Sequence, residues 1–145
     1  MVRLFFVPER ELRLMRDSVV LCVDDDPGIR ELYQTMLSRN GYEAITVSDA
    51  YQALTVYRFA GNVDIAIVDL EMPGMNGYEL AERLKMLDPA LPIVMVSSSD
   101  PELEEMSPFV DAAIRKGVPI RNILDRIELL LAEDKDPPTE TRLPC

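Results

Sequence analysis

Three short segments of this chain are apolar at nearly every position, and polar or turn-forming residues flank each of them. The segments are 18–23, 65–68 and 93–96. An unbroken apolar run of this length is typical of a strand that is covered on both faces, as in a parallel sheet. Amphipathic helical patterns separate the segments, so strands and helices alternate along the chain. This alternation predicts an α/β domain in which helices cover both faces of one parallel sheet.

Five strand–helix units follow one another along the chain. The expected strands are 18–23, 43–47, 64–69, 93–96 and 112–115, and the expected helices begin near residues 27, 50, 78, 101 and 119. The first helix carries clear signals, with Asp26 as N-cap, Pro27 at its first position and Gly41 just past its end. The fourth helix is expected to be short, because Pro101 opens it and Pro108 limits it. Five units predict a flavodoxin-like, doubly wound five-stranded parallel sheet with strand order 2-1-3-4-5 and five helices.

The length of 145 residues fits one domain and little more. We expect an N-terminal extension over 1–17, a compact domain over 18–132 and a disordered tail over 133–145, since the tail is rich in proline and charge. No apolar run is long enough to span a bilayer, and the first residues lack the apolar stretch of a secretory signal. Cys22 and Cys145 form no disulfide framework and fit a reducing compartment, so we expect a cytoplasmic protein without membrane contact.

The complete absence of histidine narrows the possible chemistry. It excludes Ser-His-Asp and Cys-His catalysis, a zinc site of the usual kind and a phosphohistidine on this chain. The net charge of −11, without any run of Lys or Arg, argues against direct binding to nucleic acid. Any reaction must therefore use Asp, Glu, Lys, Ser, Thr or Tyr side chains.

Polar side chains stand where the predicted strands end. Asp24 and Asp25 follow the first strand, Asp69 ends the third, Ser97 follows the fourth and Lys116 follows the fifth. In a sheet of this order the functional site lies beyond the carboxyl ends of the strands, where strands 1 and 3 are neighbours. The sequence therefore predicts that three carboxylates, a hydroxyl and an ammonium group converge at one edge of the sheet.

Three carboxylates at short range repel one another unless a cation neutralises them. An all-oxygen set of ligands suits Mg²⁺, which often binds one or two carboxylates together with phosphate oxygens. A carboxylate can also attack a phosphoryl group to form an acyl phosphate, a reaction that needs charge neutralisation more than acid–base catalysis. The pattern predicts a magnesium-dependent phosphoacceptor.

Three stretches of the sequence and one single residue resemble the receiver domain of two-component response regulators. They are 20–26 (VLCVDDD), 68–77 (VDLEMPGMNG), 96–97 (VS) and Lys116. The D-x-x-M-P-x-M-x-G pattern that begins at Asp69 is specific, and the resemblance covers about residues 18–132. It implies that Asp69 accepts a phosphoryl group from the phosphohistidine of a sensor kinase or a phosphotransfer protein.

The resemblance also implies how the other residues act. Asp25 and Asp69 would ligate Mg²⁺ together with the backbone carbonyl of Glu71, and Asp24 would act largely through metal-bound water. Ser97 would move toward the phosphoryl group and Lys116 would pair with one of its oxygens. Such a domain signals to an output partner that the sequence does not identify. It is no enzyme beyond its own phosphotransfer and autodephosphorylation.

Two positions depart from the family pattern. The family lysine is usually followed directly by proline, whereas this chain has Lys116-Gly117-Val118-Pro119. Ala113 stands where the family has an aromatic residue that turns inward on activation. We therefore expect a switch that does not use a ring flip.

Two other functions fit parts of the pattern. One is a receiver-like binding module that is never phosphorylated, which a Mg²⁺ titration would help to distinguish. The other is a phosphatase of the haloacid dehalogenase type, because Asp69-Leu70-Glu71 imitates its Asp-x-acid motif. The motif of that family lies on the first strand, and turnover of a phosphate ester would reveal such an enzyme.

Overall fold

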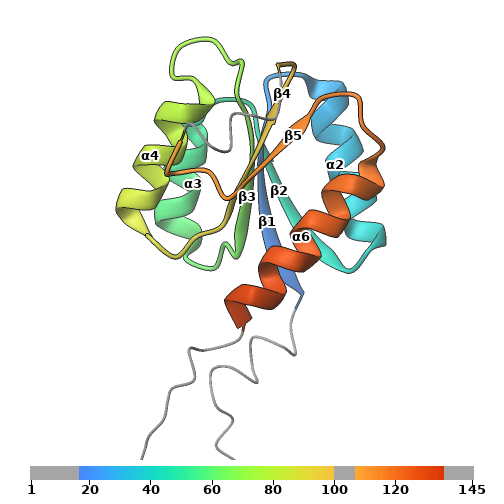
Figure 1. Cartoon of the computed structure of the whole chain (residues 1–145). Coiled ribbons are helices and arrows are strands. Elements are labelled where there is room, and N and C mark those ends of the chain that lie inside the picture. Colours follow the sequence, from blue (N-terminus) through green and yellow to red (C-terminus); the bar gives the residue numbers. More distant parts are fainter. Residues whose placement is uncertain (1–16, 100–106, 136–145) are drawn as a thin grey trace, which may run out of the picture.

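A computed structural model of the chain describes residues 17–99 and 107–135. The strands form one parallel sheet with the order β2-β1-β3-β4-β5. The elements are β1 (Ser18–Val23), α2 (Pro27–Arg39), β2 (Tyr42–Val47), α3 (Ala50–Ala60), β3 (Ile65–Asp69), α4 (Gly77–Leu87), β4 (Ile93–Ser97), β5 (Ala112–Arg115) and α6 (Ile120–Lys135). Helices α3 and α4 cover one face of the sheet, and α2 and α6 cover the other (Figure 1).

The predicted sheet, with its parallel strands and its order 2-1-3-4-5, is confirmed. The described residues contain four helices. The expected short helix after Asp100 falls on 100–106, outside the described residues, as do 1–16 and 136–145 of the two predicted terminal segments. Residues 133–135, which were predicted to begin the disordered tail, instead form the end of α6. None of the helices in the described part of the chain has the length and apolarity that crossing a bilayer requires.

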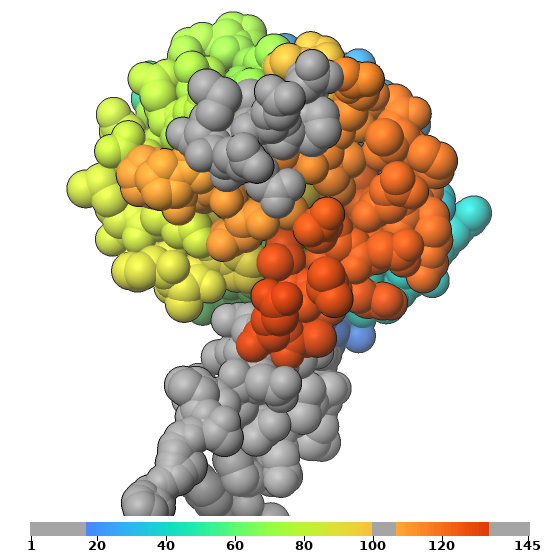
Figure 2. Space-filling view, viewed as in Figure 1, coloured from blue at the N-terminus to red at the C-terminus, as the bar shows by residue number. Residues whose placement is uncertain are grey.

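Each face of the sheet has its own apolar core, because successive strand residues point to opposite faces. In β1, Leu21 and Val23 pack with α3 and α4, whereas Val20 and Cys22 pack with α2 and α6. All six residues of β1 are buried. The space-filling view shows the red side chains of α6 on the lower part of one face and the yellow-green side chains of α4 on its left (Figure 2). The strands that end at the site are thus held from both sides.

Helix caps end the two loops that carry the site and start the helices that follow. The Asp26 side chain accepts a hydrogen bond from the Gly28 amide at 2.8 Å and caps α2 directly after β1. A capping box between Asn76 and Glu79 starts α4. These caps limit how far the residues beyond β1 and β3 can move away from the edge of the sheet.

Gly77 is expected to be irreplaceable at the start of α4. A β-carbon built there would lie 2.6 Å from the Asp69 carbonyl oxygen, 2.7 Å from Leu70 Cα and 2.8 Å from Met95 Sδ. Gly77→Ala should therefore lower the free energy of unfolding by about 1–3 kcal/mol, the usual range for overpacking, as measured by urea denaturation. Gly28→Ala is the control, because its β-carbon would meet only the Asp26 side chain, at 3.2 Å. Equal losses in the two variants would contradict this explanation.

Candidate functional site

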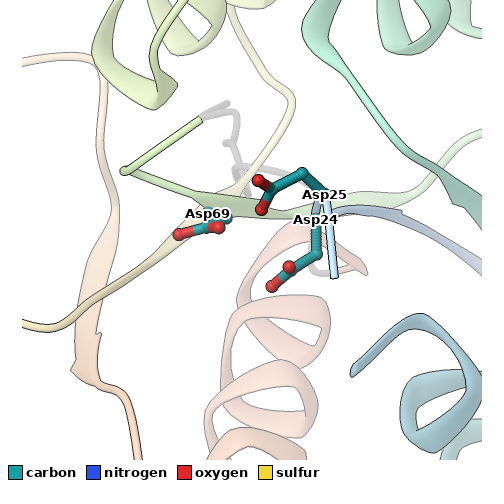
Figure 3. Close-up of side chains that lie close together, drawn as sticks. All are labelled: Asp24, Asp25 and Asp69. Carbon is teal, nitrogen blue, oxygen red and sulfur yellow. The ribbon is translucent and has the colours of Figure 1, made fainter. Parts of the chain in front are cut away.

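Three acidic side chains converge at the carboxyl edge of the sheet. Asp24 and Asp25 follow β1, and Asp69 is the last residue of the neighbouring strand β3. One carboxylate oxygen from each lies within 4.8 Å of the others (Figure 3). The structure thus brings together the three carboxylates that the sequence places at these strand ends.

Burial differs among the three acids. Asp24 is 3% exposed and Asp69 is 2% exposed, whereas Asp25 is exposed. Burial raises the pKa of Asp24, opposed by the hydrogen bond that its Oδ1 accepts from the Asp26 amide at 2.9 Å and by the charge of Lys116. Burial also raises the pKa of Asp69, against the hydrogen bond from Lys116. The pocket therefore holds charges that water does not fully stabilise.

Lys116, which directly follows β5, brings a positive charge to the pocket. Its backbone amide donates to the Ser97 carbonyl at 2.8 Å, which places it beside the end of β4. Its Nζ lies 2.9 Å from Asp69 Oδ1 and 3.3 Å from Glu71 Oε1. Partial burial acts to lower the pKa of Lys116, but its interactions with both carboxylates raise it overall. Lys116 is therefore a stable cation that two acids share.

The two oxygens of Asp69 have different surroundings. Oδ1 accepts from Lys116 and from the Glu71 amide, the latter at 3.2 Å. Oδ2 is buried and has no hydrogen-bond partner among the described residues. A buried polar atom without a partner costs free energy in a stable fold, so its presence points to a ligand or a reaction at that atom.

Ser97 lies at the end of β4 and is 1% exposed. Its hydroxyl donates to Glu71 Oε2 at 2.7 Å and also lies 2.8 Å from the Ser99 hydroxyl. The Ser98 amide donates to Glu71 Oε1 at 3.2 Å. Two of these contacts make the Glu71 carboxylate a bridge between the ends of β3 and β4.

The contacts of the Glu71 side chain were missed by the sequence analysis, which gave this residue a role in the receiver site through its backbone carbonyl alone. A signal for it does exist. Glu71 lies two residues beyond the end of β3, and β3 pairs with β4. A long acidic side chain at that point can reach a hydroxyl at the end of the neighbouring strand.

The two departures from the family pattern have clear places in the structure. Ala113 is buried in β5 beside Met95 of β4. After Lys116 the chain turns at Gly117, whose φ of 93° is strained for any residue with a side chain. The extra residues before Pro119 therefore form a turn that leads into α6.

A cavity of about 490 Å³ opens beside the acids, between α2 and the start of α6. Its lining combines Asp24, Asp25 and Lys116 with apolar side chains that include Ile29, Tyr33 and Ile120. The sequence analysis did not predict this cavity, because it depends on how two helices pack. The cavity therefore lies at the same edge of the sheet as Asp24, Asp25 and Lys116.

Doubly wound α/β domains of this strand order bind their ligands beyond the carboxyl ends of the strands, at the switch point where Asp24 and Asp69 lie in this chain. The family model of the response regulator receiver domain matches residues 20–128. The chain therefore belongs to the response regulator receiver domain family.

Curated relatives carry this domain within longer proteins. The chain is 34% identical over 103 residues to the autoinducer 1 sensor kinase/phosphatase LuxN of Vibrio harveyi, covering 70% of this chain and 12% of that protein. It is 29% identical over 124 residues to the DNA-binding response regulator MtrA of Mycolicibacterium smegmatis, covering 83% of this chain and 54% of that protein. The chain thus spans about half or less of the length of these relatives.

Solved structures agree with the fold. A CheY-like receiver domain from Methanospirillum hungatei superposes with a TM-score of 0.75 at 28% identity, covering 82% of this chain and 97% of that one. The response regulator TrrA of Thermotoga maritima, solved in complex with Mg²⁺ and BeF, gives a TM-score of 0.70 at 28% identity, covering 78% and 98%.

Proposed function

We propose that the chain is a phosphoacceptor of a two-component system, and that Asp69 receives the phosphoryl group. The observation that carries this proposal is the asymmetry of the Asp69 carboxylate. Lys116 holds Oδ1, whereas the buried Oδ2 has no partner among the described residues. A receiver domain that begins at residue 18 and ends with α6, preceded by an extension over 1–17 and followed by a tail after Lys135, remains part of the proposal.

The reaction is transfer from a phosphohistidine on a partner. An oxygen of Asp69 forms a bond to phosphorus, the P–N bond of the phosphohistidine breaks, and its electron pair returns to the imidazole nitrogen. The product is an acyl phosphate, and this chain needs to supply no proton. A reaction for which the chain supplies no proton agrees with a site built from carboxylates, a hydroxyl and Lys116. The ammonium group of Lys116 and the hydroxyl of Ser97 would bind phosphoryl oxygens.

The pocket residues fit a magnesium ion. Three carboxylate oxygens, one each from Asp24, Asp25 and Asp69, lie within 4.8 Å of one another and make an all-oxygen donor set. We propose that Asp25 and Asp69 would ligate Mg²⁺ directly with the backbone carbonyl of Glu71, and that Asp24 would act through water. When bound, the ion would neutralise the carboxylates and the phosphoryl oxygens.

The donor is proposed to be a sensor histidine kinase or a phosphotransfer protein. TrrA supports this assignment, because it has also been solved in complex with the histidine kinase ThkA, and that structure aligns with 31% identity and a TM-score of 0.72. The chain would act in the cytoplasm as a signalling domain. Its only chemistry would be its own phosphotransfer and autodephosphorylation.

Phosphoryl transfer can be tested without knowing the kinase. The full chain is incubated with acetyl phosphate and Mg²⁺, and its intact mass is measured. We expect the mass of one added phosphoryl group, because one acidic side chain combines burial with a free oxygen. No added mass, with either acetyl phosphate or phosphoramidate, would contradict the proposed function.

A further inference from the structure

The carboxylate of Glu71 occupies the groups that a phosphoryl group on Asp69 would need. Ser97 Oγ donates to Glu71 Oε2 at 2.7 Å, and Lys116 Nζ lies 3.3 Å from Glu71 Oε1. The Ser98 amide donates to the same Oε1 at 3.2 Å. One anionic side chain therefore contacts a hydroxyl, an ammonium group and a backbone amide at the rim of the pocket.

The Ser97 hydroxyl cannot donate its proton to Glu71 and to a phosphoryl group at the same time. The Ser97 hydroxyl has a single proton. In its contact with Glu71 that proton is donated to the carboxylate, while the Ser99 amide donates to the same Oγ at 3.0 Å. Ser97 must therefore leave Glu71 before it can donate to an oxygen on Asp69.

Charge makes the competition stronger. The Glu71 carboxylate accepts hydrogen bonds from Ser97 and Ser98 and pairs with the Lys116 ammonium group at 3.3 Å, a set of contacts that suits its anionic form. Acyl phosphate formation adds a negative charge beside it, and Lys116 already serves Asp69 and Glu71 together. Like charges at this distance repel, and the burial of Asp69 limits how far water can screen the repulsion.

Glu71 has a way out of the pocket. Its side chain is 42% exposed, in contrast to the buried side chains of Asp69 and Ser97. It can rotate into solvent without disturbing the apolar cores. Since the Ser98 amide donates to the Glu71 carboxylate, a rotation of this side chain into solvent would release the backbone at Ser98.

We propose that the Glu71 carboxylate is an internal competitor of the phosphoryl group: it holds Ser97, Ser98 and Lys116 in the resting state and is displaced when Asp69 is phosphorylated. The proposal rests on the proposed function, because it assumes that Asp69 is the acceptor. It assigns Glu71 a positioning role through its side chain and makes release of the Ser98 amide the first consequence of phosphorylation.

The test compares Glu71→Ala and Glu71→Gln with the wild-type chain. Beryllofluoride affinity is measured by titration calorimetry in Mg²⁺, and the labelling rate with acetyl phosphate by intact mass. We expect Glu71→Ala to raise the beryllofluoride affinity about tenfold, the size of one charge-assisted hydrogen bond. Glu71→Gln should give a smaller gain, since it keeps an acceptor for Ser97 but loses the charge. Glu82→Gln, an exposed acid on α4, is the control and should change nothing.

A second measurement reads the resting state alone. Without Mg²⁺ or phosphodonor, hydrogen exchange at the Ser98 amide should be faster in Glu71→Ala than in the wild-type chain, because its acceptor is gone. Unchanged or lower affinity in Glu71→Ala, in a chain that still labels at wild-type rates, would overturn the competitor role and leave the phosphoacceptor intact. If neither the wild-type chain nor any variant binds beryllofluoride or becomes labelled, the proposed function fails and this inference fails with it.

Discussion

Replacing Asp69 with alanine is expected to abolish the phosphoryl adduct. The wild-type chain, incubated with acetyl phosphate and Mg²⁺, should form an acyl phosphate that hydroxylamine removes, and Asp69→Ala should form none. The physical reason is that Asp69 combines a buried, unpartnered oxygen with the ammonium group of Lys116 at 2.9 Å. Intact mass before and after hydroxylamine measures both the amount and the chemical nature of the adduct.

The fold should survive this change. Asp69→Ala removes a desolvated carboxylate, and Lys116 keeps Glu71 as a partner at 3.3 Å. A thermal melt of the variant checks this. Asp125→Ala, on the exposed surface of α6, is the matched control and should label like the wild-type chain. If Asp69→Ala were labelled to the wild-type level, another residue would be the acceptor.

Mg²⁺ is expected to stabilise the folded chain strongly. An ion that binds only the folded state adds RT ln(1 + [L]/Kd) to the free energy of unfolding, about 2.7 kcal/mol at a hundredfold excess over Kd. The reason is the repulsion among the three carboxylates, whose oxygens lie within 4.8 Å of one another. Urea denaturation with and without Mg²⁺ measures the gain. Asp25→Asn should remove most of it without affecting the core, because Asp25 is exposed.

The pH dependence of this gain provides a further check. The pKa values of Asp24 and Asp69 are raised in the folded state, so their contribution to stability is fully present below the unfolded pKa of about 3.9. This contribution to stability is lost as the pH rises through the raised pKa values of the folded state, where both carboxyl groups become charged. Stabilisation by Mg²⁺ should therefore be largest at neutral pH and smaller in mildly acidic buffer. An equal gain at both pH values would show that the ion binds elsewhere.

Much of the site could be predicted because parallel strands end at one edge. Once the apolar segments are interpreted as strands in the order 2-1-3-4-5, the positions of Asp24, Asp69 and Ser97 follow from where each strand stops. The periodicity of buried residues decides the fold, and the fold decides which distant residues become neighbours. That step requires no knowledge of any side-chain conformation.

The contacts of Glu71 could not be predicted in the same way. Its side chain has several rotatable bonds and is partly exposed, so the backbone position does not determine where its carboxylate lies. The carboxylate bridges Ser97 and Lys116 only because those groups are oriented by β4 and the turn after β5. The cavity beside the acids has the same origin, since α2 and α6 form it together through packing.

The position of Asp69 on β3 limits how quickly, and by what motion, a signal can leave the pocket. β3 pairs with β1 on one side and with β4 on the other, so its backbone can shift only if two ladders of hydrogen bonds open together. Such opening approaches global unfolding and is rare and slow. Rotation of an exposed side chain takes only picoseconds to nanoseconds. A signal carried by rotation of Glu71 and release of the Ser98 amide would thus leave the pocket far faster than the sheet beneath it can rearrange.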